Sequence, residues 1–519
     1  MEIELEEEGH LKAHLGLGVG RFGAWLGITV WILCGVVWSE GPGTASSRIP
    51  AERLQQYSDL AVTWMQQYLR IDTTNPPGNE LRAVAFYKKI LDQEGIENRA
   101  FEYAPGRGDL WARLSRDSGS SDGDQNPHPF DKLRAGSVAQ NATRVGHPRP
   151  IILLNHMDVV TSDASHWKVP PFSGEIRDGY LWGRGAQDMK DEGLAQLVVM
   201  VMLKREKVAL DRDVIFLAVA DEEAEGTGTD WFIEHQRELL GNAEFLINEG
   251  GENLLENAKV KYVGVDVGEK TTYWMHVVAH GRPGHGSRPN PDSAPNRLVR
   301  ALGRILAYQT PLRVLPVVDE FLRDMAPQET PERAAEYRNI QKAIGEKKFQ
   351  EEVEKDESLN FLLRDTISLT MMGGSQQTNV IPPEAWANLD VRILPGGDPQ
   401  AVLEAVRAVV NDPNVTVEPL SAEFKVANYS GTDNALYAAI REVSGKYFPG
   451  TPVVPHITSG YTENQRYRPL GIASYGFNPY TATDEEGNTE HGNDERIRVE
   501  EVRRGPRILF DVVVRVAGR

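Results

Sequence analysis

Two short clusters of metal-binding side chains each follow an apolar, β-branched run in this sequence. His-Met-Asp at 156–158 comes after the run 151–154, and Asp-Glu-Glu at 221–223 comes after the run 214–220. Both runs predict buried strands. Burying a histidine or a carboxylate at a strand end costs free energy unless a metal ion or hydrogen bonds compensate. Ligands of open α/β sheets bind at the carboxyl ends of strands, so a metal site is the first hypothesis.

Five side chains are candidate metal ligands: His156, Asp188, Glu223, Glu249 and His491. Imidazole nitrogen and carboxylate oxygen without sulfur suit zinc, cobalt or manganese. If one carboxylate bridges, such a set holds two ions about 3.5–4 Å apart. Asp158, two residues after His156, is placed to accept the other imidazole N–H and fix the tautomer. Glu222 remains to take a proton from an attacking water, and these groups together hydrolyse amides.

Each cluster by itself is weak evidence, because His-x-Asp or Asp-Glu-Glu is more often a solvated turn than a site. His276 and His456 are therefore interpreted as structural, and Glu485-Glu486, which no apolar strand precedes, as a solvated loop. The candidates gain weight together, since several of them follow predicted strands of one sheet.

The composition excludes other kinds of site. The net charge of −19 argues against nucleic acid binding, which needs a basic face. Cys34 is the only cysteine, so the chain has no internal disulfide framework and no thiolate metal cluster. A bound metal must then be held by histidine and carboxylate side chains.

A length of 519 residues exceeds one ordinary core, so we expect two domains plus accessory segments. Strand and helix patterns alternate at first, whereas strict alternation near 271–278 indicates an antiparallel strand and a change of architecture. The expected order is an N-terminal hydrophobic segment and linker at 1–50, a first catalytic segment at 51–270 with a disordered insertion at 115–148, a second domain at 271–422, and a second catalytic segment at 423–519. Within the second domain we expect a helix at 399–410 and a strand at 415–419.

The stretch 22–38 carries no charge and is of borderline length for a membrane-spanning helix. Arg21 precedes it, and the small residues 43–45 offer a cleavage site. A buried helix is the alternative, but nothing nearby resembles its partner. We expect an exported protein, periplasmic or extracellular, or one anchored to a membrane through this segment.

The strings HMD at 156–158, GRGAQDMK at 183–190 and DEE at 221–223 resemble those of the aminoacylase/carboxypeptidase G/acetylornithine deacetylase family of dinuclear zinc metallopeptidases. The similarity spans about 53–515 and is closest in character to the carboxypeptidase S-like branch. It implies a zinc-exopeptidase-like three-layer α/β/α catalytic domain with an inserted α+β, ferredoxin-like lid and dimerisation domain. It also implies two Zn²⁺, with Co²⁺ or Mn²⁺ as possible substitutes.

The resemblance assigns a role to each candidate residue. Asp188 would bridge the two metals, His156 and Glu249 would complete one ion's site, and Glu223 and His491 would complete the other. Glu222 would be the general base and Asp158 the acid that orients the histidine.

The resemblance also assigns three residues of the inserted domain. His285, in Gly-His-Gly-Ser, would reach the partner subunit's active site and polarise the scissile carbonyl. Asn379 and Arg392 resemble the substrate-binding pair. An arginine fork suits a substrate carboxylate, and an asparagine amide can donate to developing negative charge. Without the resemblance, Arg392 would be interpreted as a surface strand arginine.

The sequence departs from the family pattern at several positions. Asn248 stands where Asp often precedes the Glu ligand, and Asp191 stands where Gly is common. Ser-Gly-Tyr-Thr-Glu at 459–463 replaces a Gly-Thr-Asp element, and a charged stretch from near Glu332 enlarges the lid. None of these changes removes a predicted ligand or the base.

We therefore predict a homodimeric, metal-dependent hydrolase that cleaves the amide bond of small peptides or N-acyl amino acids bearing a free carboxylate. One alternative is a catalytically silent binding or scaffold protein of the same fold, which the intact Glu222 and ligand set disfavour. The other is aminopeptidase activity at the same site, which Arg392 disfavours because a cationic clamp selects carboxylates.

Overall fold

The structure, a computed structural model, describes residues 44–116, 148–421, 427–458 and 460–519. Within these ranges no helix is both long and apolar enough to cross a membrane. The hydrophobic segment 22–38 and most of the predicted insertion 115–148 lie outside the described residues.

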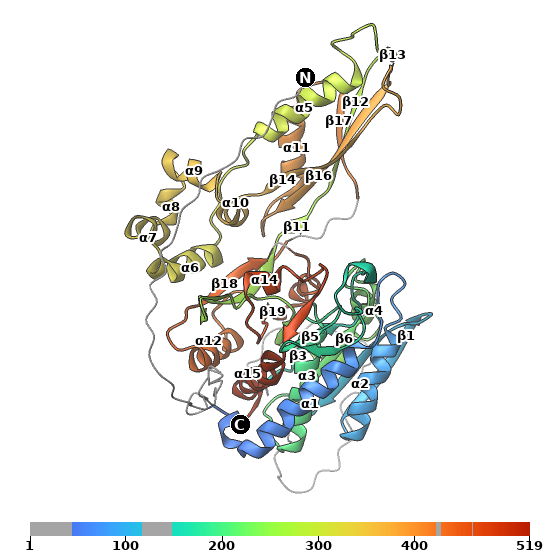
Figure 1. The fold of residues 1–519 in the computed structure, drawn as a ribbon. Helices are drawn as coiled ribbons and strands as arrows, with labels where there is room; N and C mark the ends of the chain where they lie inside the picture. The colour runs from blue at the N-terminus through green and yellow to red at the C-terminus, as the bar shows by residue number, and fades with distance from the viewer. Residues whose placement is uncertain (1–43, 117–147, 422–426, 459) are drawn as a thin grey trace, which may run out of the picture. The chain divides into compact units, whose positions relative to one another are not determined.

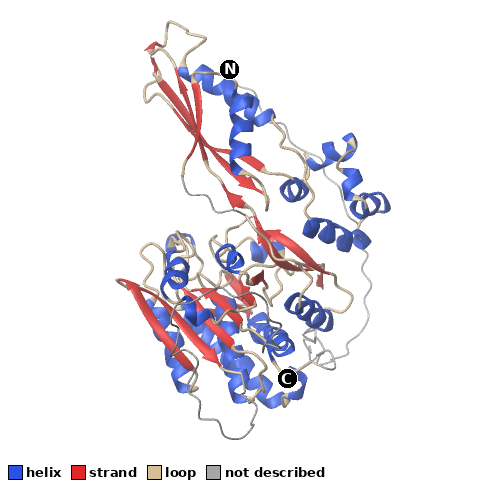
Figure 2. Ribbon diagram, turned by 180° about the vertical axis from the view of Figure 1, so that it is seen from behind, coloured by secondary structure: helices blue, strands red, loops and turns tan. Residues whose placement is uncertain are grey.

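A central sheet of eight strands joins the N-terminal part of the chain to two strands from its C-terminal part (Figure 2). In spatial order these are β1 (Glu97–Ala104), β2 (Arg107–Leu114), β6 (Val214–Val219), β3 (Ile151–His156), β7 (Phe245–Asn248), β19 (Ala473–Gly476), β10 (Val263–Glu269) and β18 (Val453–Thr458). The neighbours β6, β3 and β7 run parallel. Their carboxyl ends therefore meet at one edge of the sheet, as the sequence pattern predicted.

Alternate residues of β3 enter two separate cores. Ile151 and Leu153 pack with helices on one face, whereas Ile152 and Leu154 pack on the other. The first face is covered by α1 (Ala51–Leu69), α2 (Leu81–Gln93), α3 (Lys190–Arg205), α12 (Ala435–Tyr447) and α15 (Val499–Ala517), and the second by α4 (Thr227–His235) and α13 (Asn464–Tyr467). Figure 1 shows α1, α3 and α15 side by side. This arrangement confirms the predicted α/β/α catalytic domain.

A second, antiparallel sheet forms the inserted unit, which we call the lid. Its strands are β11 (Thr271–Thr272), β12 (Met275–His280), β14 (Thr366–Gly373), β16 (Glu384–Ile393) and β17 (Val415–Pro419). Two helices, α5 (Ala294–Ala307) and α11 (Pro399–Val410), share its core. A separate pair, β13 (Gly284–His285) with β15 (Val380–Ile381), extends from this unit. The predicted α+β class of the insertion is confirmed.

Five helices follow the first lid helix, and the first of them packs against β18 of the catalytic sheet. They are α6 (Pro316–Met325), α7 (Pro331–Arg338), α8 (Ile340–Ala343), α9 (Lys347–Val353) and α10 (Glu357–Leu363). Their buried residues belong to the same core as those of β10 and β18. The Phe321 ring lies 6.1 Å from that of His456 on β18, and Glu320 accepts hydrogen bonds from Thr432 and Arg441.

Short elements complete the fold near the C-terminal loops. They are β4 (Glu175–Arg177), β5 (Tyr180–Trp182), β8 (Leu255–Glu256), β9 (Lys259–Val260), α14 (Asp484–Gly487) and β20 (Arg496–Arg498). The interpretation of Glu485-Glu486 as a solvated loop is wrong for Glu486. That residue is buried, closes the capping box of α14 with Thr483 and pairs with Arg498. A capping box and a distant arginine compensate the buried charge, and neither depends on a preceding strand.

Candidate metal centre

The buried imidazole of His156 lies between two carboxylates. His156 is the last residue of β3, and its Nε2 lies 3.0 Å from Oδ1 of Asp188 and 3.0 Å from Oε2 of Glu249. Glu249 directly follows β7, the neighbour of β3 in the sheet. Asp188 comes two residues before α3. Three elements thus direct one nitrogen and two oxygens at a common point.

The second oxygen of Asp188 points to a different histidine. His491 Nε2 lies 2.7 Å from Asp188 Oδ2 and 3.2 Å from Oε2 of Glu223. His491 has a left-handed φ of 54° in the loop between α14 and β20. The structure therefore brings together all five predicted ligands, in two groups that share Asp188.

The donor set fits bound metal. Glu223 Oε1 and Glu249 Oε1 are buried and have no hydrogen-bond partner among the described residues. An unpaired buried carboxylate oxygen is costly unless a cation compensates it. The ligand atoms of His156, Asp188 and Glu223 lie within 4.8 Å of one another. Imidazole nitrogen with carboxylate oxygen is the chemistry that zinc and its neighbours accept.

Both histidines lie in strongly acidic surroundings. The pKa of His491 rises to about 11, because hydrogen bonds with Asp188 and Glu223 stabilise its protonated form. Burial would lower the pKa of His156, yet the charges of Glu249 and Asp188 raise it well above its usual value. For Asp188, burial opposes ionisation, but the two histidines hold its pKa below the usual range. The carboxylates of the site are thus stabilised by positive charge, which bound cations would supply.

Glu222 and Glu223 diverge on the turn after β6. Glu223 faces His491, whereas a carboxylate oxygen of Glu222 lies within 4.8 Å of the ligand atoms of His156 and Glu249. Burial raises the pKa of Glu222 well above its usual value, and the charge of Glu249 adds to this effect. A nearby cation favours the carboxylate form and reverses the shift. Glu222 is therefore placed to accept a proton at this centre.

Asp158 makes more contacts than the sequence suggested. The Nδ1 of His156 lies 3.1 Å from the backbone carbonyl oxygen of Asp158 and 3.7 Å from its carboxylate. The carboxylate instead accepts the backbone N–H groups of Glu222, at 3.1 Å, and Glu223, at 3.2 Å. Asp158 thus connects the end of β3, where His156 lies, with the turn that carries the candidate base.

Glu495 is a residue of the centre that the sequence analysis missed. It is almost fully buried and pairs with Arg184 at 2.6 Å. Its carboxylate also accepts the backbone N–H groups of Gly185 and Gln187. Glu495 therefore holds the loop before Asp188 against the loop after His491. Its only sequence signal was its position four residues after the candidate ligand His491.

A cavity of about 1300 Å³ opens onto the centre. The candidate ligands Asp188, Glu223, Glu249 and His491 line it together with Glu222. Arg392 of β16 also lines this cavity, and its guanidinium makes two hydrogen bonds of 2.7 and 3.0 Å with Asp390. The apolar side chains Trp274, Phe361 and Leu420 lie on its wall as well.

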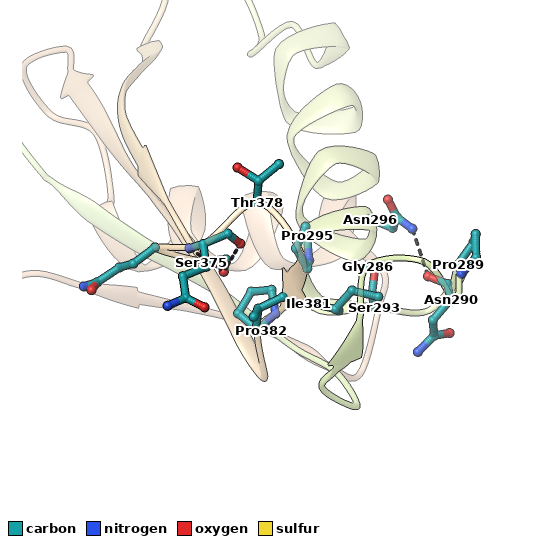
Figure 3. A pocket seen from close by; sticks show the side chains of 13 residues that line it. Gly286, Pro289, Asn290, Ser293, Pro295, Asn296, Ser375, Thr378, Ile381 and Pro382 are labelled. Carbon is teal, nitrogen blue, oxygen red and sulfur yellow. Dashed lines mark hydrogen bonds between the residues drawn. The ribbon is translucent and has the colours of Figure 1, made fainter.

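His285 and Asn379 lie elsewhere on the lid. Neither belongs to the described residues that line the large cavity. They meet where β13 pairs with β15, and the Asn379 carbonyl accepts the N–H of Gly286. A smaller cavity of about 480 Å³ lies beside them, with Gly286 and Thr378 in its wall (Figure 3). Within one chain, the structure separates these two residues from Arg392.

Three of the departures from the family pattern are buried residues, and one of them, Thr462, also lines the large cavity. Thr462 donates to Glu269 at 2.6 Å, and Glu463 is fully buried and accepts from Thr229. Asn248 ends β7, buried, and its side-chain amide has no hydrogen-bond partner among the described residues.

The comparisons with known proteins agree with this site. The family model for peptidase family M20/M25/M40 matches residues 152–515. The N-fatty-acyl-amino acid synthase/hydrolase PM20D1 of Homo sapiens is 29% identical over 376 residues, 70% of this chain and 74% of that protein. Aminoacylase-1 of Homo sapiens is 26% identical over 84% of this chain and 90% of its own. The M20 family metallo-carboxypeptidase Sso-CP2 from Sulfolobus solfataricus has a TM-score of 0.59 at 18% identity, covering 87% of this chain and 98% of that one.

Proposed function

The chain belongs to peptidase family M20/M25/M40, and from this premise we propose that it is a dinuclear metallohydrolase that cleaves the amide bond of N-acyl amino acids or small peptides with a free carboxylate. The observation that carries the proposal is the position of Asp188 between His156 and His491, one oxygen toward each. A carboxylate in this position suits a bridge between two ions.

The proposed metal site consists of the two groups of candidate ligands that share Asp188. Asp188, His156 and Glu249 would hold one ion, and Asp188, Glu223 and His491 would hold the other. When bound, such ions polarise a carbonyl and lower the pKa of a water molecule. We expect zinc, with cobalt or manganese as substitutes, because the ligands are nitrogen and oxygen.

Glu222 carries the proton transfers in this proposal. Its carboxylate takes a proton from the attacking water and then gives it to the leaving amine. The shared backbone hydrogen bonds to Asp158 hold Glu222 and Glu223 in one turn, so base and ligand keep their separation. His285 and Asn379 would donate to the developing negative charge on the carbonyl oxygen.

Arg392 supports a substrate with a free carboxylate. Its guanidinium lines the same cavity as Glu222 and is held in place by Asp390. A planar fork of N–H donors binds a carboxylate at two points. The names of two relatives, an N-fatty-acyl-amino acid hydrolase and an aminoacylase, and that of a carboxypeptidase neighbour point to the same substrate class. The apolar wall of Trp274 and Phe361 is consistent with an apolar acyl group or side chain.

A hydrolysis assay tests the proposal directly. Purified protein is incubated with zinc, cobalt or manganese and with N-acetyl amino acids, N-fatty-acyl amino acids or dipeptides, and the released amine is quantified. We expect turnover of at least one substrate with a free carboxylate and none of its carboxamide analogue. Stoichiometric metal binding without turnover of any of these would favour a silent binding protein, and preference for a free amine would favour an aminopeptidase.

We further propose a homodimer formed through the lid. Strand β14 lies at the edge of the lid sheet, and among described strands it pairs with β16 alone. Its Met371 and Met372 are more than half exposed, as are Val299 and Leu306 of α5. An exposed apolar sheet edge is a ready site for pairing with a second copy. Such a dimer would bring His285 and Asn379 of one subunit to the large cavity of the other.

Export or membrane anchoring remains a proposal that rests on the uncharged stretch 22–38. Cell fractionation with a C-terminal tag tests it. We expect the protein in the membrane or exported fraction, and full-length protein in the cytosolic fraction would contradict the proposal.

A further inference from the structure

The turn Asn-Pro-Pro-Gly at 75–78 has no role in the proposed mechanism. Its first residue nevertheless lies next to the turn that carries Glu222 and Glu223. Asn75 is buried, with 6% of its surface exposed. Its side-chain Nδ2 donates to Oδ2 of Asp158 at 2.8 Å and to Oδ1 of Asp221 at 2.8 Å. One amide nitrogen therefore lies between two carboxylates that would otherwise repel each other.

Both carboxylates hold the turn that carries the base, one from within the chain at its start and the other through hydrogen bonds from the loop after β3. Asp221 immediately precedes Glu222, and Asp158 accepts the backbone N–H groups of Glu222 and Glu223. A bond from Asn75 to each of them closes a ring of hydrogen bonds around this turn. Because Asp221 has a left-handed φ of 74°, the turn departs from the strand at that residue.

The backbone around Asn75 is hydrogen-bonded to the loop that follows the ligand His156. Asn75 N–H donates to the carbonyl of Val159 at 2.9 Å, and the Thr73 hydroxyl donates to the carbonyl of Met157 at 2.7 Å. Residues 73–75 thus run alongside 157–159, directly after His156. The Asn75 amide cannot shift without moving this loop as well.

A cation outside the metal site balances the second carboxylate. Arg107 Nη2 lies 2.9 Å from Asp221 Oδ1, and the same guanidinium pairs with the fully buried Glu80. The hydroxyl and the backbone N–H of Thr227 both donate to Oδ2 of Asp221, which holds this carboxylate from a second side. Arg107 and Thr227 thus fix the position of the Asp221 carboxylate, and Asn75 binds it from a third side.

We propose that Asn75 is a positioning residue that holds the Glu222–Glu223 turn in register with the metal centre by clamping Asp158 to Asp221. It touches neither substrate nor metal. The inference rests on the proposed function, since it assigns Asn75 to the turn that presents the base and one metal ligand. Outer groups of this kind tune both metal affinity and activity.

Two substitutions separate the donor role from packing. Asn75→Asp keeps the shape but replaces both N–H donors with an oxygen facing two carboxylates, and Asn75→Ala removes the amide. We expect both to lower kcat and zinc affinity by about 10- to 100-fold, with Asn75→Asp at least as damaging and KM changed by no more than about twofold. Zinc affinity is measured by competition with a chromogenic chelator, independently of turnover.

Asn434→Ala is the matched control. Asn434 caps α12 through the backbone N–H groups of Leu436 and Tyr437, and its amide donates to the carbonyl of Gly431. Its loss should lower the melting temperature and leave kcat and zinc affinity unchanged. If Asn75→Asp retains both quantities, or changes them no more than Asn434→Ala does, the inference is overturned.

Further outcomes keep the test decisive. If the Asn75 variants do not fold, Arg107→Gln removes the counter-charge of Asp221 while leaving the amide, and it should lower zinc affinity and kcat in the same direction; unchanged values would contradict the clamp. If the wild-type protein turns over no substrate but Asn75→Asp weakens zinc binding, the inference stands and the proposed function fails. If the wild type turns over substrate and Asn75→Asp has unaltered zinc affinity and kcat, the proposed function stands and the inference about Asn75 fails.

Discussion

Asp188 and His491 are 303 positions apart in the chain, yet Oδ2 of Asp188 lies 2.7 Å from Nε2 of His491. The other oxygen of the same carboxylate faces a histidine on the central sheet. This single carboxylate therefore joins a loop near the C-terminus to the end of β3 in the central sheet. The proposed chemistry depends on that junction.

Glu222→Gln should remove turnover and leave the bound metal in place. The amide is similar in shape but cannot accept the proton from water, and loss of a general base typically costs about 10²- to 10⁴-fold in kcat. Kinetics together with metal analysis by mass spectrometry measure both effects. Glu225→Gln, on the exposed side of the same loop, is the control and should be unaffected. A kcat close to that of the wild type for Glu222→Gln would refute its role as the base.

Zinc binding should release protons near neutral pH. In the metal-free protein the pKa of His491 is about 11 and that of His156 is well above its usual value, so both imidazoles are protonated and must lose a proton to bind metal. Apparent affinity should therefore rise with pH. Titration calorimetry in buffers of different ionisation heat measures the protons released; zinc binding with no proton release would contradict these shifts.

The raised pKa of His491 also determines how the stability of the metal-free protein changes with pH. The folded-state pKa of His491 lies above its unfolded value of about 6.5. Its stabilising contribution is therefore complete below that value and is lost as the pH rises toward about 11. Chemical denaturation of chelator-treated wild type and His491→Ala should show a difference in unfolding free energy that shrinks between these limits. A difference that grows with pH would contradict the assignment.

Arg392→Ala should weaken substrate binding more than it slows the chemical step. Loss of a charge-assisted hydrogen bond to a substrate carboxylate costs about 1.5–3 kcal/mol, so KM should rise roughly 10- to 100-fold. Initial rates with a carboxylate substrate and its carboxamide analogue measure this selectivity. Arg407→Ala removes a surface pair with Glu418 on the same lid and should not change KM. Unchanged selectivity in Arg392→Ala would exclude the clamp.

Mixed dimers test whether the lid acts on the partner's cavity. His285→Ala and Glu222→Gln should each be nearly inactive as homodimers. An equimolar mixture that exchanges subunits should regain about a quarter of wild-type activity, because half of the dimers are mixed and each has one complete site. Activity assays before and after exchange, with sedimentation to establish the dimer, measure this recovery. A monomer, or a dimer with no recovery, would argue against action across subunits.

The sequence predicted the elements that carry the first half of the centre. Apolar, β-branched runs at 151–154 and 214–220 predicted strands that the structure confirms as β3, which ends at His156, and β6, which Glu222 and Glu223 follow. Such runs are local properties, so they can be recognised from the order of residues. The helix 399–410 and strand 415–419 of the lid were likewise predicted with the bounds that the structure has.

Other features needed the folded chain. The contacts of Asp158 with the backbone of Glu222, the clamp at Asn75 and the contact of Glu486 with Tyr180 all depend on segments far apart in the sequence. Loops without periodicity give no local signal for their partners, because their side chains are paired by tertiary packing.

The sequence by itself determined the kind of chemistry available: histidine and carboxylate ligands without sulfur, a spare glutamate, and a family resemblance that fixed their order. Only the tertiary structure decided which oxygen faces which histidine, since distances between groups hundreds of residues apart follow from strand order and loop closure. It also placed Arg392 on the cavity that the candidate metal ligands line, and His285 away from that cavity within one chain. The types and spacing of residues in the sequence decide which side chains are available, whereas tertiary packing sets the distances at which they can act together.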